Sequence, residues 1–174
     1  MREYHTEALV LDKESVGERD ARVTLYTETL GRIVATVTSA RKITSKLSPH
    51  LEPMNFALVR LTKKNSFHVT DALKSGTFAH GIEVVKVLRA MTMESEPDPE
   101  LWFALKRGKA AVPDVLRILG FDSQLALCEL CNQSEPVYFI LARSCYCCGN
   151  FFPSLLKQHQ YVSLGALGRE PIQL

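Results

Sequence analysis

The sequence predicts an α+β protein, in which a small N-terminal β-barrel is followed by an α-helical domain with a four-cysteine zinc site. Three observations predict this class: alternation of apolar and polar residues up to about residue 71, helical spacing of apolar residues beyond residue 80, and two C-x-x-C pairs within residues 128–148. The length of 174 residues is sufficient for two small domains. We expect the first domain at residues 1–78 and the second at residues 79–174, with a zinc ribbon at residues 128–148.

Five short strands are predicted between Thr6 and Asp71. In the clearest of them, Ala21–Thr27, small or apolar residues alternate with polar ones, which is the period of a half-buried strand. Gly31 is expected in the hairpin before the next strand, because glycine adopts a positive φ without a Cβ clash. The remaining candidates are residues 56–61 and 67–70, joined by a turn at residues 63–66. Five short antiparallel strands fit the OB-fold barrel, and an SH3-like barrel is the alternative.

Three helices are predicted in the second domain. Apolar residues recur at helical spacing over residues 81–93, which predicts an amphipathic helix. Asp98 is a typical N-cap residue and directly precedes a proline, which predicts that a second helix begins there. A third, short helix is predicted at residues 113–119, with Gly120 as its C-terminal cap.

A strongly basic stretch lies at residues 31–64. It contains seven lysines or arginines and one acid, Glu52, so it carries about +6, whereas the whole chain carries +2. The predicted sheet also carries Tyr26, Phe56 and Phe67. Phosphate neutralisation and base stacking on aromatic rings together hold single-stranded nucleic acids, so the combination favours nucleic-acid binding over a merely solvated face. The residues predicted to contact nucleic acid are Arg32, Arg41, Lys42, Lys46, Arg60, Lys63, Lys64 and Phe56.

The two cysteine pairs have the spacing of a zinc site. Four thiolates arranged as two C-x-x-C turns can surround Zn²⁺ tetrahedrally, which leaves no position for water and predicts one structural rather than catalytic ion. Asn132 and Gly149 directly follow the pairs, where a positive φ is expected. Cys147 is left as a free thiol, with a C-x-C pair ending at Cys147 as the alternative. The predicted ligands are Cys128, Cys131, Cys145 and Cys148.

Catalytic motifs are missing from the sequence, so we do not expect an enzyme. No phosphate-binding loop, dinucleotide-binding motif, nucleophile elbow or H-E-x-x-H motif occurs. Acids such as Glu14, Glu18 and Asp20 could bind Mg²⁺ in a nuclease, but acids beside a turn are usually only solvated. The N-terminus lacks the apolar region of a secretory signal, and no apolar run approaches the ~20 residues that span a bilayer. We therefore expect a cytoplasmic, nucleoid-associated protein with no membrane contact.

Several motifs resemble the bacterial RecO recombination mediators. In the first half these are GERDARVTLYT at residues 17–27, LG at 30–31, ARK at 40–42, SKL at 45–47 and LEP at 51–53. In the second half they are LRILGF at residues 116–121, the two cysteine pairs, and YF at 138–139. Their order and spacing cover most of the chain. In two respects the chain departs from the family: Ser39 stands where a glycine is usual, and the helical domain is shorter.

The resemblance implies a function in recombinational DNA repair. The family binds single- and double-stranded DNA, anneals complementary strands and helps to load RecA onto strands coated with single-stranded DNA-binding protein, together with RecR. By this analogy Arg41, Lys42 and Lys46 contact DNA and the four cysteines bind zinc. The short helical domain places the family's groove for single-stranded DNA-binding protein in question. Two alternatives are a protein-binding adaptor, whose basic face is incidental, and an RNA-binding protein of the OB and zinc-ribbon type.

Overall fold

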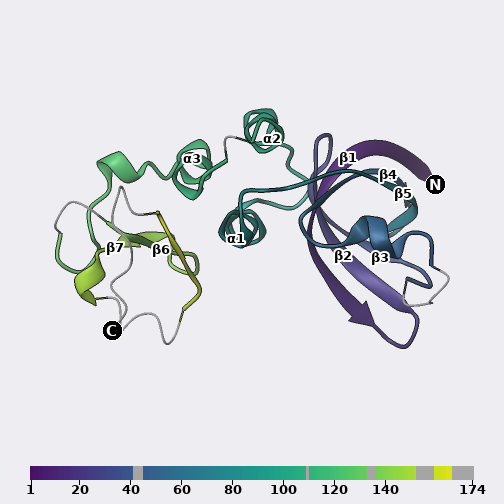
Figure 1. Ribbon diagram of the computed structural model, residues 1–174, viewed down its shortest axis with the longest axis horizontal. Coiled ribbons are helices and arrows are strands. Elements are labelled where there is room, and N and C mark those ends of the chain that lie inside the picture. The colour runs from purple at the N-terminus through teal and green to yellow at the C-terminus, as the bar shows by residue number, and fades with distance from the viewer. Residues whose placement is uncertain (41–44, 109, 133–135, 152–158, 166–174) are drawn as a thin grey trace. The chain divides into compact units, whose positions relative to one another are not determined.

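The computed structural model describes residues 1–40, 45–108, 110–132, 136–151 and 159–165 (Figure 1). The chain forms two compact units. The first contains Met1–Gly81 and Thr92–Gly108, and the second contains Ile82–Met91 and Lys109–Leu174. The chain therefore leaves the first unit, returns to it and leaves it again.

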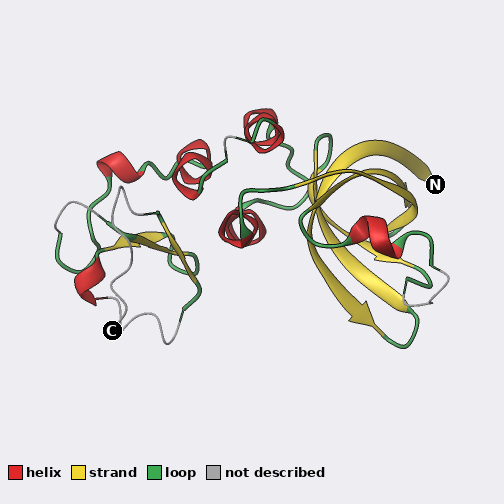
Figure 2. Cartoon of the chain, in the orientation of Figure 1, coloured by secondary structure: helices red, strands yellow, loops and turns green. Residues whose placement is uncertain are grey.

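Five strands of the first unit form a closed barrel (Figures 1 and 2). Their order around the barrel is β1-β2-β3-β5-β4, and the antiparallel pairing of β4 with β1 closes the sheet. β3 and β5 are parallel, whereas the other neighbours are antiparallel. A short 3-10 helix, Ser48–Leu51, lies between β3 and β4. The strands are β1 (Arg2–Val16), β2 (Asp20–Thr27), β3 (Gly31–Val37), β4 (Asn55–Lys63) and β5 (Phe67–Thr77).

The barrel core follows from the alternation of side chains along the strands. On β3, for example, the residues at every second position are buried and those between them are half-buried. The core residues include Val23, Leu25, Ile33, Leu61 and Val69. The predicted strands are confirmed, although β1 begins earlier than Thr6 and β5 continues to Thr77.

One end of the barrel is covered by residues 92–108, and we call it the covered end. Gly31 (φ +66°), at the start of β3, lies so close to this segment that a Cβ there would be 2.2 Å from the carbonyl oxygen of Glu96. Beside it, the Arg32 Nε donates to the carbonyl oxygen of Thr92 at 3.0 Å, and the Ser95 amide donates to the Arg32 carbonyl oxygen at 2.9 Å. Side-chain and backbone hydrogen bonds thus attach this segment to β3.

Helix α2 (Pro99–Lys106) belongs to the covering segment. As predicted, Asp98 caps it, because its carboxylate accepts the amide hydrogen of Leu101 at 3.0 Å. Its Trp102 ring centroid lies 6.0 Å from that of Phe56 and 6.4 Å from that of Tyr26. These contacts place residues 92–108 with the barrel, whereas the sequence suggested one boundary between residues 78 and 79. Whether residues 1–78 and 79–174 fold independently of each other stays a prediction.

The second unit combines two α-helices with a three-stranded sheet. Its helices α1 (Ile82–Met91) and α3 (Val112–Ile118) confirm the predicted helices, and Gly120 follows α3 with φ +90°. The sheet order is β7-β6-β8, and the Phe139 ring on β6 packs against Phe121 and Tyr146 at centroid distances of 5.3 and 4.9 Å. The smaller elements are 3-10 helices at Ser123–Leu125 and Gly149–Phe151, and β6 (Tyr138–Ile140), β7 (Cys145–Cys147) and β8 (Tyr161–Ser163).

The helices within the described residues are all too short or too polar to cross a bilayer.

Candidate nucleic-acid interface and metal site

Those predicted basic residues that the structure describes lie on different parts of the barrel. β3 runs from Gly31 at the covered end to Val37, about 20 Å away for a strand of this length. Ala35 pairs with Phe67, so the chain leaves β3 at the same end as the turn between β4 and β5. We call this end the basic end. It is defined by the cations Arg2, Lys46, Lys63 and Lys64.

At the basic end, two cations face each other across neighbouring strands. Arg2 on β1 is the direct register partner of Lys63 on β4. Like charges that face each other across two strands repel and destabilise the pair. A bound anion would reduce this repulsion. The Lys63 Nζ lies 4.4 Å from the centroid of the Phe67 ring, and Lys64, which follows it in the turn, is exposed. Arg2 was not predicted, because only the strand register brings it beside Lys63.

The segment that carries Lys46 begins at the same end. The Ser39 amide donates to the Asp20 carboxylate at the start of β2, and the Lys13 ammonium group binds the carbonyl and hydroxyl oxygens of Ser48 at 3.1 and 2.8 Å. In the sequence, Lys46 lies between Ser39 and Ser48, and its side chain is exposed. Among the described side chains, no carboxylate forms an ion pair with any of the four cations of the basic end. The predicted contacts Arg41 and Lys42 lie outside the described residues.

Three other predicted contacts lie elsewhere. Arg60, on the outer face of β4, forms an ion pair with Glu3 of β1, and the hydrogen bond from Arg60 lowers the pKa of Glu3. Arg32 lies at the covered end, where it holds Thr92. Phe56 is only 7% exposed, and the Lys106 Nζ lies 4.6 Å from its ring centroid. Phe56 stays a predicted nucleic-acid contact, but α2 covers its ring, which sequence periodicity alone did not indicate.

Three cysteines of the second unit form a compact cluster. The sulfur atoms of Cys128, Cys131 and Cys148 all lie within 4.8 Å of one another. Those of Cys131 and Cys148 are 3.7 Å apart. In a tetrahedral zinc site with Zn–S bonds of ~2.3 Å, two sulfurs are separated by ~3.8 Å, so the spacing fits this metal.

Backbone amide groups near Cys128 favour its negatively charged thiolate form. Burial alone would raise the pKa of Cys128, but amide hydrogens of Cys148, Cys131 and Leu130 directed at its sulfur lower that pKa to about 6. The thiolate, which is the form that binds metals, is therefore favoured near neutral pH. Asn132 has the predicted positive φ of 55°, whereas Gly149 does not: it begins a 3-10 helix instead.

The fourth predicted ligand, Cys145, is not part of this cluster. Burial raises the pKa of Cys145 to about 12, and the adjacent Glu129 carboxylate contributes to the rise. Cys147, predicted to be a free thiol, is 3% exposed and packs with Cys128 and Cys148. The structure thus brings together three of the four predicted ligands, and Cys145 and Cys147 both pack in the same region without joining the three sulfurs.

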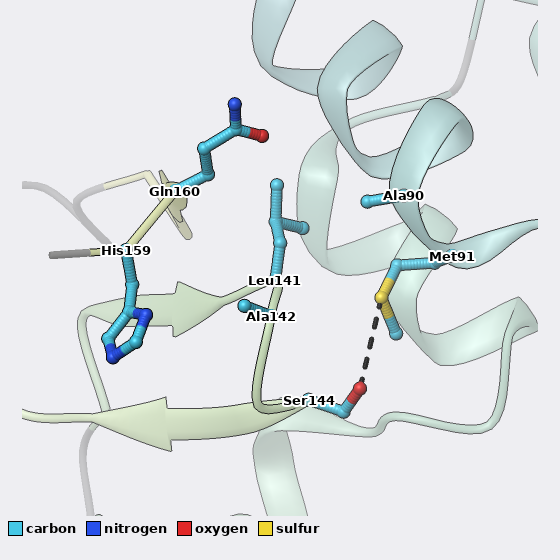
Figure 3. Close-up of a pocket in the computed structure, with 7 residues that line it drawn as sticks. All are labelled: Ala90, Met91, Leu141, Ala142, Ser144, His159 and Gln160. Carbon is cyan, nitrogen blue, oxygen red and sulfur yellow. Dashed lines mark hydrogen bonds between the residues drawn. The ribbon is translucent and has the colours of Figure 1, made fainter.

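A hollow of about 710 Å³ also lies in the second unit (Figure 3). α1, the turn between β6 and β7, and the residues before β8 line it. The Ser144 hydroxyl lies 4.0 Å from the Met91 sulfur at its wall. No residue predicted to bind DNA or metal contributes to it. The lining residues are Ala90, Met91, Leu141, Ala142, Ser144, His159 and Gln160.

These features define a class of protein with a five-stranded barrel, one basic barrel end, and a second unit that contains clustered thiols. The family model described as "Recombination protein O N terminal" matches residues 1–75, a range that includes β1 to β4 and most of β5. The motifs in both halves of the chain and the relatives below point to the same family. The chain belongs to the RecO family.

The chain is similar to several relatives named "DNA repair protein RecO". The one from Dehalococcoides mccartyi is 39% identical over 134 residues, which cover 77% of this chain and 50% of the relative. The one from Heliobacterium modesticaldum is 38% identical over 96 residues, covering 53% and 35%. The one from Syntrophobacter fumaroxidans is 26% identical over 182 residues, covering 96% and 70%. The chain spans about half the length of several of these relatives.

Proposed function

We propose that this protein acts in DNA repair and homologous recombination by binding single- and double-stranded DNA at the basic end of the barrel. Membership of the RecO family supports the biological role. The barrel supports the mode of action, because its strand order, with parallel β3 and β5, is that of an OB-fold, a frequent single-strand-binding fold. The protein acts by binding and not by catalysis.

The observation that carries this proposal is that Arg2, Lys63 and Lys64 lie at one barrel end, from which the segment that carries Lys46 begins. Three separate segments of the chain supply them, and no described carboxylate neutralises them. A strand of phosphates would relieve the repulsion between Arg2 and Lys63 and would release counterions on binding. Arg41 and Lys42 belong to the segment that starts at the same end, and we include them in the proposed interface.

Annealing follows from contacts to the backbone rather than to the bases. Cations that bind phosphates position a strand without reading its sequence. If the bases remain accessible, a complementary strand can pair with them while the charge repulsion between the two backbones is reduced. We propose this mechanism for strand annealing by the basic end.

We also propose that the cysteine cluster binds one structural zinc ion. Cys128, Cys131 and Cys148 would hold it, and the ion would link the segment before β6 to the end of β7. Such a link stabilises a small unit whose own core is thin.

The proposed partners are RecR, single-stranded DNA-binding protein and, indirectly, RecA. This part of the proposal rests on the family resemblance alone. Pull-down of the full chain with each purified partner would test it.

The DNA interface predicts a charge-reversal effect that depends on position. In the full chain, Lys64→Glu should weaken binding of a fluorescent single-stranded oligonucleotide and make the slope of log affinity against log salt shallower by about 1, because one phosphate contact is lost. Fluorescence anisotropy across a salt series measures both quantities.

Lys74→Glu is the matched control, because Lys74 is an exposed lysine of the same barrel, on β5, outside the basic end. It should leave the salt slope unchanged. Equal effects of the two variants would contradict a localised interface. Tighter binding of RNA than of DNA of the same sequence would favour the RNA-binding alternative, and no binding at low salt would favour the protein adaptor.

A further inference from the structure

The segment that follows β3 carries Lys46, and side chains of β1 and β2 hold it at two points. At the first point, the Ser39 amide donates to the Asp20 Oδ1 atom of β2 at 2.8 Å. At the second point, the Lys13 Nζ of β1 donates to the carbonyl and hydroxyl oxygens of Ser48 at 3.1 and 2.8 Å. Lys46 lies between the two points in the sequence, so both contacts restrict the part of the chain that carries it.

Ser39 has a backbone conformation that serine does not favour. Its φ is +56°, in the left-handed region that residues with a Cβ rarely adopt. Ser39 lies in the turn directly after β3, and the next residue, Ala40, is buried in the barrel core. The shape of this turn therefore depends on contacts from outside it, and the hydrogen bond to Asp20 is one that attaches it to a neighbouring strand.

Strand pairing places Asp20 beside this turn. Asp20 is the first residue of β2, and the next residue, Ala21, is the register partner of Val37 at the end of β3. The chain that leaves β3 thus turns beside the start of β2. The Asp20 side chain is half-buried, and a carboxylate makes a stronger hydrogen bond to an amide than a neutral acceptor does.

A carboxylate at this place opposes DNA binding by its charge. Val37 ends β3 at the basic end, so Asp20, next to the pair of Ala21 with Val37, lies at the basic end too. There it repels the phosphates that the lysines and arginines attract. Its hydrogen bond to the Ser39 turn gives it a use that compensates for this repulsion.

We propose that Asp20 is a positioning residue of the DNA interface, which holds the Ser39 turn so that the following segment presents Lys46 to the bound strand. Asp20 itself does not contact DNA. Lys13 supports the other end of the same segment. This inference rests on the function proposed above.

Two substitutions in the full chain separate the hydrogen bond of Asp20 from its charge. Asp20→Ala and Asp20→Asn both remove one negative charge, which alone would tighten DNA binding, but only asparagine keeps an oxygen that can accept the Ser39 amide hydrogen. Asp20→Ala should bind a fluorescent single-stranded oligonucleotide several-fold more weakly than Asp20→Asn. Its slope of log affinity against log salt should be shallower by about 1, because the Lys46 contact is lost. Equal affinities and slopes of the two variants would overturn the inference.

Ser39→Gly provides a rescue experiment. Glycine adopts a positive φ without a Cβ clash, so the turn should form without the contact from Asp20. The double variant Asp20→Ala/Ser39→Gly should therefore regain the affinity and the salt slope of Asp20→Asn. A double variant that binds as weakly as Asp20→Ala would contradict the role of the turn.

Asp98→Ala is the matched control for a loss of stability, because it removes a carboxylate cap at the covered end of the same unit. It should leave the salt slope unchanged. A slope as shallow as that of Asp20→Ala would mean that the slope reports stability rather than position, and would overturn the inference.

Hydrogen exchange of the wild-type chain tests the contact without any variant, should Asp20→Ala not fold. The Ser39 amide should exchange slowly, and exchange at the rate of an unstructured peptide would overturn the inference. Absence of DNA binding by the wild-type chain at low salt would instead refute the proposed function, and the inference with it.

Discussion

Gly31 is the residue at which the covering segment approaches the barrel most closely. A Cβ at Gly31 would lie 2.2 Å from the Glu96 carbonyl oxygen, whereas a Cβ at Gly17 would have no neighbour within 4 Å. Both glycines have a positive φ, +66° and +60°. The two positions therefore separate the cost of backbone conformation from the cost of the steric clash.

We predict that Gly31→Ala destabilises the first unit more than Gly17→Ala does. Each alanine costs about 1–2 kcal/mol for its left-handed conformation, and the clash at Gly31 adds roughly 1–3 kcal/mol. Urea unfolding followed by the fluorescence of Trp102, the single tryptophan of the chain, measures both. Equal losses of stability would show that residues 92–98 do not hold their position against β3.

Glu7 gives the first unit a dependence on pH. Burial alone would raise the pKa of Glu7, but hydrogen bonds from Lys106 at 2.8 Å and Ser75 at 2.6 Å lower it below the ordinary value of 4.5. A lowered pKa stabilises the folded state above pH 4.5, and this contribution is lost as the pH falls through the folded-state pKa.

Glu7→Gln should therefore reduce the loss of stability on acidification. The difference between wild type and variant should stay below about 1 kcal/mol, because the pair with Lys106 is partly exposed. Urea midpoints from Trp102 fluorescence at neutral pH and below pH 4.5 measure it. As a control, Glu83→Gln, on α1 of the second unit, should not change this transition. A pH dependence of the Glu7 variant equal to that of the wild type would contradict the prediction.

At the scale of elements, α2 depends on its N-cap. Asp98→Ala removes the hydrogen bond to the Leu101 amide and should destabilise the first unit by about 1 kcal/mol. Trp102 lies on this helix, so its fluorescence should report the change directly. Asp122→Ala removes the equivalent cap of a 3-10 helix in the second unit and should leave the Trp102 transition unaltered. A shift of that transition by both variants would mean that the two units unfold together.

The elements themselves could be predicted from the sequence because local patterns determine them. Alternation in Ala21–Thr27 and the proline after Asp98 each specify a local conformation. The partner of α2 could not be predicted, because an apolar helix face does not indicate which surface will cover it. For the same reason the sequence did not indicate that α2 covers the Phe56 ring.

The sites could be predicted only in part, because the pairing of strands cannot be derived from local sequence patterns. Spacing in the sequence identified the cysteines, but the fold decides that the sulfurs of Cys128, Cys131 and Cys148 lie close together and that of Cys145 does not join them. Likewise, Arg2 joins the basic end only through its pairing with Lys63. Such contacts join residues far apart in the chain, and no local pattern contains them.

At the scale of the whole molecule, the cysteine cluster belongs to one compact unit and the basic end to the other. Chelation of zinc from the full chain should therefore disorder the sheet of the second unit and leave DNA binding largely intact. Hydrogen exchange of the β6 amides should increase on addition of a chelator, while anisotropy of the bound oligonucleotide changes little. Loss of DNA affinity in parallel with the loss of β6 protection would contradict this division of labour.

The path of the chain between the units also has a consequence during translation. α1 is synthesised before residues 92–108, which cover one end of the barrel, but it packs against α3 and β8, which follow much later. Translation proceeds at roughly 5–20 residues per second, so several seconds pass on the ribosome before α3 and β8 can cover the apolar face of α1. This face consists of Val84, Val85, Val87 and Leu88. This nascent helix is therefore the segment on which we expect a ribosome-associated chaperone to act first.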